Sequence, residues 1–163
     1  MIHHSMFNVL FWGKMIPLQG VPYIKKAAEL LRGDPSIEFR IIGDPPVSYS
    51  ELVALIPTAD VCLGIFGDTD KAQRVIPNKV YEAIAAGKPV ISGDTPAIRE
   101  LFTDRENILL CKMASPEDLV IKILELKNDA KLRNRIAQEG HALYLEKLKP
   151  EYVVTPLIAY LHG

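Results

Sequence analysis

The sequence has little of several features that would mark a specialised class of protein. Its 163 residues include two cysteines and no cluster of side chains with metal-ligand spacing. Lysine plus arginine (19) nearly balances aspartate plus glutamate (20), which predicts no nucleic-acid partner. No apolar run approaches the roughly 20 residues of a membrane-spanning helix. Residues 1–14 also lack the basic start and the cleavage site of a signal peptide, so we expect a first strand there.

The remaining composition suits one ordinary globular domain. With 48% hydrophobic residues, a chain of this length can bury one core, and we expect residues 1–163 to form a single domain. Cys62 and Cys111 each lie inside an apolar run that is typical of a strand. This placement predicts reduced core thiols in a cytoplasmic protein, because disulfides persist mainly in oxidising compartments.

Short apolar runs alternate with segments of helical spacing along the chain. We expect five strands, at residues 7–12, 38–42, 60–66, 89–92 and 107–111. Helical patterns cover residues 22–31, 49–57, 78–86 and 96–101, and the last third is mostly helical. Parallel strands need such crossovers, so the alternation predicts an α/β fold: a doubly wound, Rossmann-like parallel sheet with helices on both faces.

One helix start combines a cation and a carboxylate just after a predicted strand. We expect Asn78 to be the N-cap of this helix, which puts Lys79 in the first turn. A cation there opposes the helix dipole by about 0.3–1 kcal/mol, and a bound phosphate would reverse that sign. Glu82 lies on the same face, free to accept from sugar hydroxyls. The alternative is an exposed ion pair between Lys79 and Glu82.

Two segments resemble a known family. Residues 77–90, Pro-Asn-Lys-Val-Tyr-Glu-Ala-Ile-Ala-Ala-Gly-Lys-Pro-Val, and the loop at residues 13–20 are similar to motifs of group 1 (family 4) retaining glycosyltransferases. The likeness is to the C-terminal, donor-binding half of these GT-B enzymes and covers most of the chain in order. In the family's Gly-Arg-x-x-x-x-Lys-Gly loop, this sequence has Lys14 for the arginine and Gln19 for the lysine. Lysine keeps the charge but loses the bidentate fork.

The resemblance implies a set of ligand-binding residues but no complete catalytic set. It implies that Gly13, Lys14 and Lys79 hold the donor diphosphate and that Glu82 binds the ribose. Contacts with the donor sugar or its loop would come from Gly67, Asp68 and Arg74. Arg74 stands where the family has a sugar-binding glutamate, and it could be a plain surface arginine, as Lys14 could be a solvated loop cation. The expected substrate is a nucleoside-diphosphate sugar of the UDP or GDP type, with no metal and no separate cofactor.

Two parts of the family pattern are missing. The acceptor-binding N-terminal domain is absent, so we expect the isolated chain to be inactive without a separate acceptor domain or subunit. Residues 42–49 connect a strand almost directly to the next helix, which predicts the five-stranded order 2-1-3-4-5 and leaves base specificity open. Two functions fit: the donor-binding half of a sugar transferase, or a non-catalytic nucleotide-sugar-binding or interaction subunit. For the apolar last helix, at residues 151–161, packing on the sheet is the ordinary expectation and docking of a partner the alternative.

Overall fold

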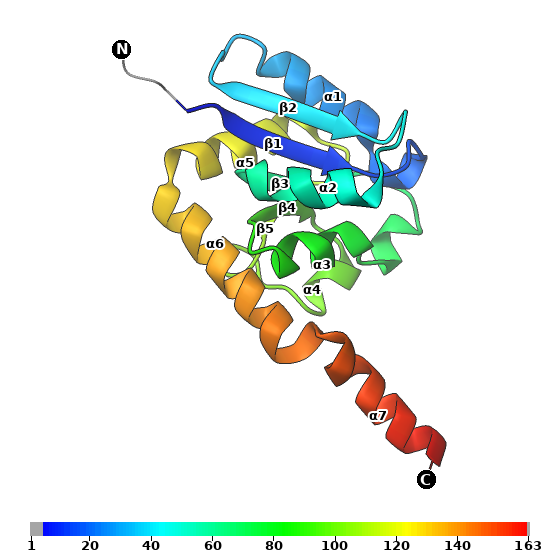
Figure 1. The fold of residues 1–163 in the computed structure, drawn as a ribbon. Coiled ribbons are helices and arrows are strands. Elements are labelled where there is room, and N and C mark those ends of the chain that lie inside the picture. The colour runs from blue at the N-terminus through cyan, green and yellow to red at the C-terminus, as the bar shows by residue number, and fades with distance from the viewer. Residues whose placement is uncertain (1–4, 163) are drawn as a thin grey trace.

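A single parallel sheet organises the chain (Figure 1). The computed structural model describes residues 5–162. Five strands pair in the order β2-β1-β3-β4-β5, and every pairing is parallel. They are β1 (Phe7–Trp12), β2 (Ile37–Ile42), β3 (Val61–Leu63), β4 (Val90–Gly93) and β5 (Leu109–Cys111). The predicted fold class and strand order are confirmed, including the direct step from β2 into the following helix.

Helices connect the strands and continue past the last one. They are α1 (Val21–Leu30), α2 (Tyr49–Leu55), α3 (Asn78–Ala85), α4 (Pro96–Arg99), α5 (Pro116–Asn128), α6 (Ala130–Leu143) and α7 (Pro150–His162). Short 3-10 turns occur at η1 (Pro17–Gln19), η2 (Ile56–Thr58) and η3 (Ala72–Arg74), and a π turn at η4 (Tyr144–Leu148). Local sequence explains several starts: Ser48 and Glu51 form a capping box for α2, and the Ser115 side chain caps α5.

Each face of the sheet has its own hydrophobic cluster, as a doubly wound fold requires. On one face α1 and α5 pack over the sheet, with Phe11, Ile24 and Ile123 fully buried. On the other face α3 and α4 contribute to a cluster that contains Leu10 and Ile84. Burial of each such side chain stabilises the fold by about 1.5–3 kcal/mol. β1 lies inside the sheet, so its carboxyl end is held between β2 and β3.

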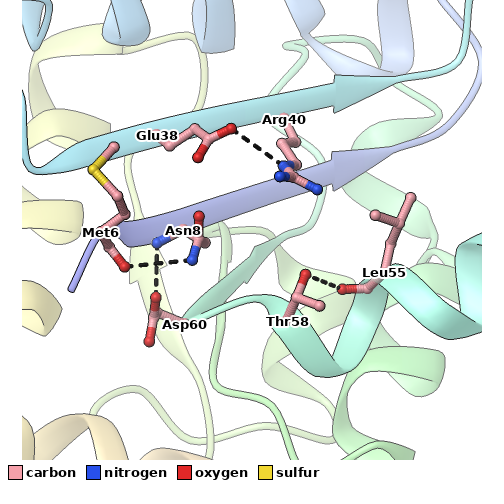
Figure 2. Close-up of polar contacts among 7 residues, drawn as sticks. All are labelled: Met6, Asn8, Glu38, Arg40, Leu55, Thr58 and Asp60. Carbon is pink, nitrogen blue, oxygen red and sulfur yellow. Dashed lines mark hydrogen bonds and ion pairs between the residues drawn. The ribbon is translucent and has the colours of Figure 1, made fainter.

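Polar contacts fix the amino ends of β1 and β3 (Figure 2). The backbone amide of Asn8 donates to Asp60 Oδ2 at 2.7 Å, and the Asp60 amide donates to the Asn8 carbonyl at 2.9 Å. Thr58 donates to the Leu55 carbonyl at the end of the preceding helical segment. These polar groups are satisfied within the fold, at the end of the strands opposite to the loops considered below.

The last helix does not pack on the sheet. α7 projects away from the body of the molecule (Figure 1), and Tyr152, Ile158 and Leu161 are exposed. The expectation that this helix covers the sheet is therefore wrong. Lys149 precedes a proline and has an extended backbone (φ −59°, ψ 142°), and a residue in that position is disfavoured in helical geometry, so the chain changes direction there. No helix in residues 5–162 has the length and hydropathy to cross a bilayer.

Candidate functional site

The candidate site lies where β1 ends and α3 begins. Trp12 and Ile42 are partners in the parallel register of β1 and β2, and the Gly13 amide donates to the Ile42 carbonyl at 3.0 Å. The loop that follows β1 therefore leaves the sheet at its carboxyl edge. In open α/β sheets, ligands bind at this edge, close to the point where the strand order reverses. Here the order reverses beside β1.

Lys79 is a buried cation in the first turn of α3. Only 6% of the residue is exposed. Its amine donates to the Gln19 side-chain oxygen and lies over the Phe11 ring, 3.8 Å from the centroid. Burial lowers the pKa of Lys79 to about 7, and the nearby Glu82 carboxylate partly opposes that shift. Without a ligand, this side chain therefore exchanges its proton near neutral pH.

Gly13 leaves room for the Lys79 amine. A Cβ at position 13 would lie 2.6 Å from Lys79 Nζ, closer than side-chain carbons approach such an atom. The backbone of Gly13 also has φ 153°, which disfavours other residues. A residue with a side chain would therefore have to displace the amine. Close approach of backbone to this amine requires glycine at this position.

The amino terminus of α3 is left open. Pro77 is the N-cap, with an extended backbone, and no side chain among the described residues caps the helix. The expectation that Asn78 is the N-cap is wrong, because the Val80 amide donates to the Pro77 carbonyl and the helix begins at Asn78. An uncapped start leaves amide donors and the positive end of the helix dipole available to an anion.

Glu82 faces the end of β1 and not Lys79. The Trp12 indole nitrogen donates to Glu82 Oε2 at 2.8 Å, across 70 residues of sequence. No ion pair joins Lys79 and Glu82 in the part of the chain that the structure describes. The alternative of an exposed ion pair is therefore wrong: Lys79 is buried, and each of the two side chains has another partner. Glu82 keeps its second carboxylate oxygen for other donors.

Lys14 points out of the same loop. It is exposed, and within residues 5–162 it makes no hydrogen bond or ion pair. Its side chain lines a hollow of about 230 Å³ together with Trp12, Gly43 and Val47. This hollow lies between the ends of β1 and β2, next to Trp12, the hydrogen-bond partner of Glu82. A flexible cation there is free to reach a ligand anion.

Gly67 holds two loops together, and Asp68 follows it on the surface. A Cβ at Gly67 would lie 2.0 Å from the Pro17 carbonyl oxygen, so the loop after β3 packs directly on η1. Gly20, with φ 72°, makes the reciprocal close approach to the Gly67 amide. Asp68 is exposed and lines a hollow of about 580 Å³ that also includes Met15 and Tyr23. Gly67 therefore has a clear packing role, and Asp68 is accessible.

Arg74 is not joined to the other predicted residues. It ends η3, is exposed, and makes no polar contact with Lys79 or Glu82 among the described residues. The structure brings Gly13, Lys79 and Glu82 together around the end of β1. Lys14 extends from the loop that follows β1 and lines the hollow beside Trp12. Asp68 lines a different hollow.

Sequence reasoning missed two partners at this site. Gln19 enters the sequence analysis only as a departure from the family's loop lysine, and Trp12 does not enter it, yet each contacts a predicted ligand-binding side chain. The partners are 60 and 70 residues apart in the sequence, so no local spacing could reveal them. The one available signal was the position of Trp12 directly before Gly13, at the functional end of a predicted strand.

Known proteins share this arrangement of elements. A model of the family described as glycosyl transferase-like matches residues 22–159. The chain belongs to this family. An uncharacterized glycosyltransferase of Methanocaldococcus jannaschii is 28% identical over 149 residues, which cover 80% of this chain and 41% of that protein. This glycosyl transferase-like chain thus spans less than half the length of that relative.

Solved structures place the fold of this glycosyl transferase-like chain among GT-B halves. The C-terminal domain of LpcC, a glycosyl transferase group 1 family protein from Francisella tularensis, superposes with a TM-score of 0.75 at 20% identity, covering 90% of this chain and 88% of that domain. Anabaena HepE, solved in complex with UDP-glucose, gives a TM-score of 0.80 at 16% identity over 96% of this chain and 49% of HepE. The chain therefore has the Rossmann-like fold of one half of a group 1 GT-B glycosyltransferase.

Proposed function

We propose that this chain is the donor-binding half of a retaining glycosyltransferase that uses a nucleoside-diphosphate sugar. The observation that carries the proposal is Lys79, a lysine amine held inside the fold at the uncapped start of α3 and against Gly13. A buried ammonium needs a counter-charge, and no carboxylate among the described residues forms an ion pair with it. A diphosphate supplies that charge.

The same groups would assist the departure of the diphosphate. In sugar transfer, the bond between the anomeric carbon and the diphosphate oxygen breaks, and negative charge develops on the leaving group. The Lys79 amine and the open amides of α3 are positioned donors for such charge, with Lys14 able to add a second cation. Fixed donors of this kind need little reorganisation during the reaction. Gly67, Asp68 and Arg74 are proposed to contact the donor sugar or its loop.

The proposal extends to the substrate and the partners of the enzyme. Nucleotide sugars of the UDP or GDP type are the proposed donors, and HepE, a structural neighbour, was solved with UDP-glucose. We propose that a second, acceptor-binding domain or subunit completes the active site, because closure of two domains excludes water from the reaction. No metal or further cofactor is part of the proposal. Cys62 and Cys111 are buried free thiols, which suits work in the reducing cytoplasm.

A second candidate function is favoured by Arg74 and Gln19. If the family's sugar-binding glutamate and loop lysine are both needed for transfer, this chain would bind nucleotide sugars without turning them over. Mixing the chain with an acceptor-binding half and a labelled donor distinguishes the two. Transfer supports the enzyme, whereas binding without transfer supports a non-catalytic subunit.

Calorimetry with matched ligands tests the diphosphate site. We expect UDP or GDP to bind more tightly than its monophosphate, because each charge-assisted hydrogen bond to the second phosphate contributes roughly 1.5–3 kcal/mol. Lys79→Met should bring the two affinities together. Lys88→Met is the matched control, since Lys88 lies beyond the other end of α3 and donates to the Pro57 carbonyl at 2.7 Å. Equal affinity for the two nucleotides in the wild type would remove the diphosphate role.

A further inference from the structure

Trp12 and Glu82 form a polar contact that the proposed function does not yet use. Trp12 is the single tryptophan of the sequence and is 7% exposed at the end of β1. Its indole nitrogen donates to Glu82 Oε2 at 2.8 Å. The Glu82 side chain makes no other hydrogen bond and no ion pair among the described residues. The carboxylate is thus held by one donor and is otherwise open.

We propose that Trp12 is a positioning residue, which holds the Glu82 carboxylate ready to accept the ribose hydroxyls of a nucleotide. This inference rests on the proposed nucleotide-binding function and adds a specific device to it. Trp12 acts through Glu82, and the reacting atoms lie elsewhere. The device links the end of β1 to the first turns of α3.

The hydrogen-bonding groups of Trp12 and Glu82 suit these two roles. An indole has one N–H and can only donate, so it uses one acceptor position of the carboxylate. A carboxylate has about four such positions, and the second oxygen of Glu82 remains able to accept. A glutamate side chain loses considerable rotamer freedom when a ligand fixes it. Because the buried indole already fixes the Glu82 side chain in the free protein, less rotamer freedom is lost when a ligand binds.

The contact between Trp12 and Glu82 lies next to two hollows in the surface. The Trp12 ring lines the hollow of about 230 Å³ that also includes Lys14 and Val47. Glu82 lines a neighbouring hollow of about 460 Å³ between α2 and α3, and Leu52 borders both. The residue after Trp12 is Gly13, which faces Lys79. Trp12, the last residue of β1, and Gly13, the first residue of the loop that follows, therefore face the two side chains proposed to bind ribose and diphosphate.

Trp12→Phe separates positioning from packing, because it removes the donor and keeps an aromatic ring. The readout is the affinity ratio between a nucleoside diphosphate and its 2′,3′-dideoxy analogue, measured by calorimetry for UDP and for GDP. We expect the variant to bind the ribonucleotide about five- to tenfold more weakly and the dideoxy analogue within about twofold of wild type. A purely structural role would weaken both ligands equally.

Phe7→Leu is the matched control, since Phe7 lies in the same strand, is also 7% exposed and sits at the opposite end. It should lower stability and leave the affinity ratio unchanged. In wild-type protein, fluorescence of the single tryptophan provides a measurement that does not depend on the variant folding. Saturating ribonucleotide should change the emission more than saturating dideoxy analogue does.

Each outcome has a distinct meaning. If wild-type protein binds the ribonucleotide but Trp12→Phe keeps the wild-type ratio, Trp12 does not position Glu82, and the proposed function is unaffected. If the two ligands change the emission of folded wild-type protein equally, the inference also fails. If wild-type protein binds neither UDP nor GDP, the proposed function is wrong and this inference fails with it.

Discussion

The amine of Lys79 lies 3.8 Å from the centroid of the Phe11 ring, where the end of β1 meets the start of α3. An aromatic face attracts a cation, but it replaces only part of the hydration that burial removes. The part of the desolvation cost that is not replaced lowers the pKa of Lys79 to about 7. The free site therefore holds a cation that is poorly compensated until an anion binds.

Lys79→Met should stabilise the free domain and abolish its preference for diphosphates. The methionine fills similar space without a desolvated charge, so we expect the free energy of unfolding at pH 7 to rise by about 1–3 kcal/mol. Denaturant titration measures the first effect, and calorimetry with UDP and UMP measures the second. A less stable variant would show that the lysine contributes more through Gln19 and Phe11 than its burial costs.

Nucleotide affinity should fall as pH rises above about 7. The free site releases the Lys79 proton near that pH, whereas a bound diphosphate favours the ammonium and keeps it charged. The complex then holds more protons than its components, so rising pH opposes binding. Calorimetry at pH 8 in buffers of different ionisation enthalpy should detect proton uptake. Lys79→Met should remove this dependence.

The lowered pKa of Lys79 gives the free energy of unfolding a pH dependence opposite in sign to that of nucleotide affinity. Between about pH 7 and the usual value of 10.5, the unfolded chain keeps the Lys79 proton and the folded chain has lost it. Stability without ligand therefore rises with pH across this window, and below pH 7 the full cost of burying the charge is present. Comparing wild type with Lys79→Met by denaturant titration at pH 6.5 and pH 9 isolates this contribution. A difference between the two proteins that is constant with pH would contradict it.

Gly13→Ala should disturb the diphosphate site more than the fold. Its Cβ would meet the Lys79 amine at 2.6 Å, and the flexible side chain can move away only by leaving its present position. We expect diphosphate affinity to fall at least tenfold, with a loss of stability of about 1–2 kcal/mol from the strained backbone. Gly33→Ala is a suitable control, because nothing lies within 4 Å of a Cβ there.

Glu82→Ala should weaken ribonucleotide binding by about 1–3 kcal/mol and leave the domain folded, because a half-buried ligand-facing side chain contributes little packing. The loss should be smaller for dideoxy analogues. Glu82→Gln tests the charge, since the amide oxygen can still accept from Trp12. If Glu82→Ala unfolds the domain and leaves the affinity of the folded fraction unchanged, the Trp12 contact is structural and the ribose role is wrong.

The sequence by itself determined the order of elements and the parallel sheet. Alternating apolar runs and helical spacing depend on local chemistry, and the short connection at residues 43–48, compared with the usual strand order of the family that the chain resembles, predicted the strand order. Only the tertiary structure decided the environment of each charge. Burial of Lys79 against Phe11, the pairing of Glu82 with Trp12 and the projection of α7 all depend on contacts, or their lack, between segments far apart in sequence. Spacing along one helix left a pair between Lys79 and Glu82 open as an alternative, and it could not be decided locally, because strands that approach a helix end leave no mark on the helix's own pattern.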